Sequence, residues 1–119
     1  MRKLSFGPFS GTSQPTNTVL VAVRLADYLE ARDLEALAKG GSLTVYVRGT
    51  LTSGTLASRG GSDNGDGTGT QVPGTSLGGG INAITALPAV GTLTQVLPWY
   101  YFRTTAPSTY SDIYVDLVI

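Results

Sequence analysis

Residues 42–51, SLTVYVRGTL, form the clearest β-strand pattern of the chain and decide its fold class. Successive side chains of a strand point to opposite faces of a sheet. The alternate positions of this segment are apolar on one face and more polar on the other: Leu43, Val45, Val47 and Leu51 against Thr44, Tyr46, Arg48 and Thr50. The alternation predicts a strand that covers a core on one side and meets solvent on the other.

Similar patterns surround this strand. Residues 19–25 and 113–119 alternate in the same way, 99–103 (WYYFR) is apolar on both faces, and 81–87 and 93–97 carry weaker signals. We therefore expect six to eight strands in an all-β fold, an antiparallel β-sandwich or jelly roll, with the C-terminal segment tied into a sheet.

Three connections interrupt the strands. Residues 27–39 are the one helix-friendly region, predicting a short helical crossover capped by Asp33 and ended by Gly40. Residues 53–80 hold ten of the sixteen glycines and predict a long Gly/Ser/Thr-rich surface loop, with short strands near Leu56 and Val72. Thr104 to Tyr110, which contains a proline, predicts a hairpin loop.

The chain of 119 residues is the size of one domain. Residues 1–17 predict an extended N-terminal arm because Gly7, Pro8 and Pro15 interrupt it, with Phe6 and Phe9 as apolar anchors. We expect these rings to dock either on the chain's own core or on a neighbouring subunit. Residues 18–119 are then a single β-sandwich domain.

The composition argues against most chemistry. Cysteine and histidine are absent, and these supply most thiolate nucleophiles, general bases and soft metal ligands. Eight Lys and Arg balance eight Asp and Glu, which removes the basic footprint of a nucleic-acid binder. No apolar run is long enough to span a membrane, and no export signal is visible. We expect no catalytic residues, no cofactor and no enzyme activity.

Two acidic patterns have plainer interpretations than a site. Residues 63–67, DNGDG, resemble part of a calcium loop, but Pro73 stands where the bidentate glutamate belongs, and the same residues are ordinary turn formers. Asp112 and Asp116 would lie about 13 Å apart on a strand, too far for paired carboxylate catalysis. No metal site is expected.

The aromatic residues are the better candidates for function. Trp99, Tyr100 and Tyr101 lie in the strand that is apolar on both faces, so both faces need cover. Core packing, a subunit contact and a platform for sugar stacking all remain open. We expect Phe6, Phe9, Trp99, Tyr100 and Tyr101 to be subunit contacts.

The Thr-rich strands, the SDNGDGTGT loop and the YSDIYVDLVI ending resemble small cysteine-free virion structural proteins of tailed bacteriophages, notably jelly-roll head decoration or cement proteins. The resemblance spans the whole chain and assigns no role to any single residue. It implies a non-enzymatic, virion-located protein, made in the host cytoplasm. That protein would stabilise the shell through contacts with its own copies, as a trimer or other homo-oligomer, and with a major capsid protein. The alternative is a carbohydrate-binding β-sandwich module that uses exposed aromatic rings.

Overall fold

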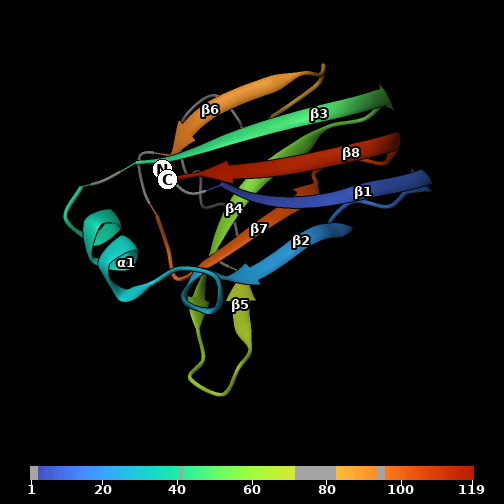
Figure 1. Ribbon diagram of the computed structural model, residues 1–119. Helices are drawn as coiled ribbons and strands as arrows, with labels where there is room; N and C mark the ends of the chain where they lie inside the picture. The colour runs from blue at the N-terminus through green and yellow to red at the C-terminus, as the bar shows by residue number, and fades with distance from the viewer. Residues whose placement is uncertain (1–2, 41, 72–82, 94–95) are drawn as a thin grey trace.

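The computed structural model describes residues 3–40, 42–71, 83–93 and 96–119, which form two facing β-sheets (Figure 1). The described strands are β1 (Lys3–Gln14), β2 (Val19–Arg24), β3 (Leu43–Ser53), β4 (Leu56–Asp63), β5 (Gly69–Gln71), β6 (Ala89–Leu93), β7 (Trp99–Thr104) and β8 (Ser108–Val118). A 3-10 turn, η1 (Leu25–Asp27), and the helix α1 (Ala31–Ala38) join β2 to β3. The predicted all-β sandwich with one helical crossover is confirmed.

The strand order defines the sandwich as a jelly roll. One sheet has the order β1-β8-β3-β6 and the other β2-β7-β4-β5, and all neighbours are antiparallel. The pairs β1–β8, β2–β7, β3–β6 and β4–β5 are those of one long hairpin, and the two sheets arise when such a hairpin is rolled up. Eight strands connected as two Greek keys are the jelly-roll architecture.

The core lies between the sheets and is built mainly by the inward faces of β3, β8 and β7. The inward residues of β3 and β8 are almost wholly buried: Leu43, Val45, Val47, Ile113, Val115 and Leu117. Leu56 and Phe102 face them from the second sheet and are equally buried. The alternation predicted for residues 43–47 and 113–117 is therefore the division between core and outer surface.

The N-terminal segment is an edge strand and not the predicted arm. β1 pairs with β8 from Lys3↔Val118 to Gln14↔Ser108, through several register shifts. Gly7 and Pro8 lie at one of these shifts, where the interrupted ladder accommodates a residue that cannot donate a backbone hydrogen bond. Proline therefore does not exclude a strand here, and the domain begins with β1.

The strand predicted near Leu56 is confirmed, but it extends to Asp63 as β4, an inner strand of the second sheet, where a surface loop was expected. It pairs with β7 on one side and β5 on the other, and Leu56, Ala57 and Ser58 are fully buried. Two glycines of this region, Gly61 and Gly69, leave room for aromatic rings of β7. Residues 63–69 form the tip of the β4–β5 hairpin, which projects from the sandwich (Figure 1). Val72 and the Gly78–Gly80 run lie outside the described residues.

Residues 104–110 do not form a hairpin loop, because β7 and β8 belong to different sheets. Two buried hydroxyl groups hold this crossing. The Thr104 hydroxyl accepts from the Thr18 backbone N–H at 2.9 Å and donates to the Pro15 carbonyl at 2.7 Å. The Ser108 hydroxyl donates to the Ala106 carbonyl at 2.7 Å and accepts from the Thr55 N–H. These bonds join the crossing to the turns that precede β2 and β4.

The helix starts earlier than predicted. Glu30 is the extended N-cap residue and Asp33 lies in the first turn, where its carboxylate faces the positive end of the helix dipole. Gly40 follows the helix with φ +94°, the left-handed conformation that was expected to end it. Leu37 is buried against the end of the sandwich.

Tyr100 is a fully buried core residue with a polar end. Its hydroxyl lies 2.7 Å from the Ser58 hydroxyl, and both side chains are buried. Burial raises the pKa of Tyr100 well above its ordinary value of 10.0, because the phenolate would lose its hydration; the hydrogen bond to Ser58 opposes this only in part.

We predict that Tyr100→Phe lowers the free energy of unfolding by about 1–3 kcal/mol at pH 7, since it leaves the buried Ser58 hydroxyl without its partner. The wild-type free energy of unfolding should be independent of Tyr100 ionisation below about pH 10 and fall as the pH rises further, because only the unfolded state ionises easily. Part of this fall should vanish in Tyr100→Phe. Urea denaturation from pH 7 to 11 measures both effects, and an unchanged alkaline fall in the variant would contradict the assignment.

Candidate functional site

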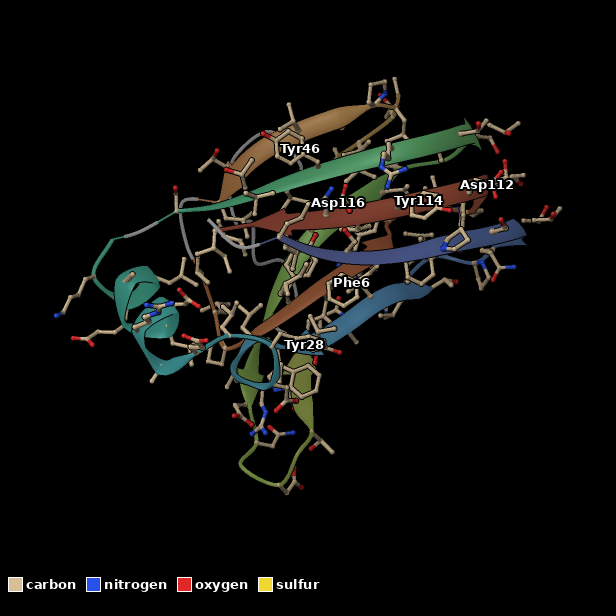
Figure 2. The ribbon with its side chains drawn as sticks, viewed as in Figure 1. Phe6, Tyr28, Tyr46, Asp112, Tyr114 and Asp116 are labelled. Atoms are coloured by element: carbon tan, nitrogen blue, oxygen red, sulfur yellow. The ribbon has the colours of Figure 1, made fainter. Side chains whose placement is uncertain are left out.

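Phe6 and Phe9, two of the predicted contact residues, point toward the core from β1. Both are partly buried and pack against the core cluster, which is the first of the two positions expected for them. Phe6 also meets Tyr28 edge-to-face, with ring centroids 5.6 Å apart and planes at 81° (Figure 2). These rings close the side of the sandwich between β1 and the 3-10 turn.

Trp99 and Tyr101 lie on the outer face of the second sheet and are covered by the chain itself. Their rings stack with centroids 5.8 Å apart and planes at 18°. A Cβ atom added at Gly61 would collide with the Tyr101 ring, and one added at Gly69 with the Trp99 ring. The glycines of the β4–β5 hairpin therefore seat these two aromatic rings.

Tyr100 is fully inside the sandwich, and Tyr101 is buried on the outer face by intrachain contacts. We therefore correct the prediction for these two residues: neither side chain offers surface to a partner. Trp99 keeps partial exposure, but its ring is packed on Gly69 and Tyr101. The demand for cover that residues 99–103 indicated is met within the chain.

Two of the exposed large apolar side chains lie together on the outer face of the β1-β8-β3-β6 sheet. Tyr46 on β3 is 47% exposed and Val90 on β6 is 57% exposed. Strand register places them in one row across the sheet, because Val90 pairs with Tyr46, Tyr46 with Asp116, and Asp116 with Ser5. Side chains directly opposite each other on neighbouring strands lie about 5 Å apart and are in contact.

We call this surface the outer groove. It has a volume of about 540 Å³ and a largely apolar lining drawn from all four strands and the residue before β6: Lys3, Tyr46, Val47, Arg48, Pro88, Ala89, Val90, Asp116 and Val118. The volume falls within the range of ligand and docking pockets, whereas an ordinary sheet face exposed to water carries mainly polar side chains.

A buried carboxylate lies in the middle of the outer groove. Asp116 is only 5% exposed although its strand position faces outward. Its Oδ2 atom lies 3.8 Å from Lys3 Nζ and 3.6 Å from Arg48 Nε, and its Oδ1 atom is buried without a hydrogen-bond partner among the described residues. Arg48 also lies over the Tyr114 ring, 4.2 Å from its centroid. Figure 2 shows Tyr46, Asp116 and Tyr114 together along β3 and β8.

Two residues of the outer groove, Tyr46 and Arg48, belong to the predicted polar face of residues 42–51. The alternation of this strand predicts Tyr46 and Arg48 on its solvent side, but it does not indicate that they meet Asp116. The partners of these residues were not predictable from local pattern, because Val90 and Lys3 reach them only through the pairing of β6 with β3 and of β1 with β8.

The DNGDG sequence is a turn at the tip of the β4–β5 hairpin. Asp63 accepts the Gly65 N–H at 3.0 Å, and Asp66 accepts from the Thr68 N–H and hydroxyl. The Gly65 N–H lowers the pKa of Asp63, and the Thr68 hydroxyl lowers that of Asp66. These carboxylates therefore stabilise the turn itself. Across the described residues, no three or more Asp and Glu side chains gather as a metal site would require.

The fold and the groove define a jelly-roll β-sandwich with one exposed apolar sheet face. Comparisons with protein-family models, with curated proteins and with solved structures found no match for this chain. Within the described residues, no helix has the length and apolar character to cross a membrane.

We predict that Asp116→Val leaves the free energy of unfolding unchanged or raises it by up to about 1 kcal/mol. The substitution removes an acceptor that has no partner in the described ranges of the chain, while the two cations it releases are more than half exposed and lose little. Asp112→Val on the same strand is the matched control. It should be destabilising by about 1–3 kcal/mol because Asp112 has φ +52° and valine is strained there.

Urea denaturation at pH 7 measures both substitutions. A loss of 3 kcal/mol or more in Asp116→Val would mean that the carboxylate is a structural element of the sheet.

Proposed function

We propose that this chain is a non-enzymatic structural protein of a virus particle, a capsid decoration or cement protein that stabilises the shell through contacts between subunits. The observation that carries the proposal is the outer groove, where exposed Tyr46 and Val90 form an apolar surface on an otherwise complete fold. Surfaces of this kind mark sites of protein–protein interaction.

The chemistry of the surface also supports an assembly role. The formal net charge is zero and 13% of the residues are charged, about half of the ~25% usual for soluble domains. Many copies can therefore lie side by side with little electrostatic repulsion. The jelly roll is an architecture of viral capsid domains, and also of lectins and cupins, so the fold alone does not select the function.

Binding to capsids tests this proposal. The purified chain should co-sediment with capsids of the virus that encodes it, at a saturating ratio of copies per shell, and should raise the temperature at which those capsids disassemble. The chain centrifuged without capsids is the control for self-sedimentation. A chain that stays in the supernatant and leaves the disassembly temperature unchanged would contradict the proposal.

A carbohydrate-binding module is the second candidate, and one observation favours it. The half-exposed Tyr46 ring lies next to a carboxylate and a guanidinium, a combination that can stack on a sugar ring and bind its hydroxyls. The buried Oδ1 atom and the apolar lining favour protein contact over sugar binding. A glycan array separates the two: sugar binding that Tyr46→Ala abolishes, with assembly intact, would support the module.

A further inference from the structure

We propose that the outer groove is the interface between two copies of this chain, packed face to face, and that Arg48 of each copy pairs with the Asp116 carboxylate of the other. The inference rests on the proposed structural function, because it names the surface and the partner for the contact between copies. Three observations support it: the incomplete carboxylate, the exposed donor beside it, and the size of the face.

Within one copy, the Asp116 carboxylate has no close hydrogen-bond donor among the described residues. Neither Lys3 nor Arg48 is within hydrogen-bond distance of Asp116, since the ion contacts measure 3.8 and 3.6 Å, and both contacts are to Oδ2. Among the described residues the buried Oδ1 acceptor has no donor, and an unpaired buried charged group carries an unfavourable desolvation cost. A second copy that supplies a donor would remove this cost.

The same face carries the donor. The Arg48 side chain is 55% exposed and holds five N–H groups, which can bind a carboxylate in a fork. Because it makes no close hydrogen bond to Asp116, it can move without breaking one. In an isologous pair every contact is reciprocal, so a contact of Arg48 in one copy with Asp116 in the other is formed twice. In a single copy the groove carries two cations, Lys3 and Arg48, for the one carboxylate of Asp116. A contact between Arg48 of one copy and Asp116 of the other gives each carboxylate a further donor.

The face has the size of a dimer interface. Three of its strands are 11 or 12 residues long and the fourth has 5. At about 3.3 Å per residue and 4.8 Å between strands, the flat area is roughly 600 Å², close to the ~800 Å² per partner of a standard interface once side-chain relief is included. Tyr46, Val90 and Val118 would form the apolar centre. The end of the face near Thr50 and Ser10 is polar and would form the rim.

Light scattering and sedimentation equilibrium on two exposed valines test the inference. Val90→Asp should raise the dimer dissociation constant by at least about 30-fold, because it places a charge at the apolar centre. Val19→Asp is the matched control, since Val19 is also exposed, at 42%, but lies on β2 of the other sheet. It should leave the dissociation constant unchanged. Circular dichroism of both variants checks that each is folded.

A second pair of variants tests the cross-contact. Arg48→Gln should weaken the dimer by about 10-fold and reduce the salt dependence of its dissociation. Arg32→Gln, which removes an exposed arginine on the helix, should change neither. The inference is overturned if Arg48→Gln dimerises like the wild type.

The outcomes separate the inference from the proposed function. A wild-type chain that stays monomeric at high concentration, or a dimer that Val19→Asp breaks and Val90→Asp does not, overturns the face-to-face interface. In either case, capsid binding by the same sample leaves the structural function standing. Loss of capsid binding with an intact, Val90-dependent dimer would instead overturn the shell-binding function and keep the interface.

Discussion

The pairing of β3 with β8 is the constraint on which the rest of the structure depends. These two strands are the inner pair of their sheet, and their inward residues, among them Val45 and Val115, are almost wholly buried in the core. Because side chains alternate along a strand, this burial fixes the opposite set on the outer surface. A shift of one residue would place Tyr46 and Asp116 in the core and the valines in water. The core therefore determines which residues form the outer groove.

The outer groove is unusual because the described residues of the chain do not cover its apolar side chains. Trp99 and Tyr101 on the other sheet are covered by the β4–β5 hairpin and by each other, whereas Tyr46 and Val90 remain exposed. The Asp116 Oδ1 atom, a buried acceptor with no donor in the described part of the chain, lies beneath the same surface. In a chain with little charge, such a face lowers its free energy by meeting another protein surface. The proposed function and the proposed self-contact follow from this one asymmetry between the two sheets.

The sequence predicts those parts of the fold that local alternation determines. Residues 43–51 and 113–119 follow the pattern strictly, and they became the central strands of the first sheet. β1 and all of β4 beyond the short strand near Leu56 were not predicted, because Gly7, Pro8 and the glycines of β4 are typical of loops. A register shift against β8 accommodates Gly7 and Pro8, and aromatic rings of β7 pack on glycines of the β4–β5 hairpin. The outer groove could not be predicted from local pattern for the same reason, since its residues meet only after four separate segments pair. The aromatic composition of residues 99–101 predicts rings that need cover, but composition does not show which rings the chain itself covers.

The exposure of two tyrosines during assembly tests the central claim most directly. Tyr46 and Tyr28 are almost equally exposed, at 47% and 44%, and lie on different surfaces. Hydroxyl-radical footprinting across a concentration series compares their oxidation rates within one sample. We expect the rate at Tyr46 to fall as the chain associates while the rate at Tyr28 stays constant. Association that leaves Tyr46 as reactive as it is in the monomer would contradict the account.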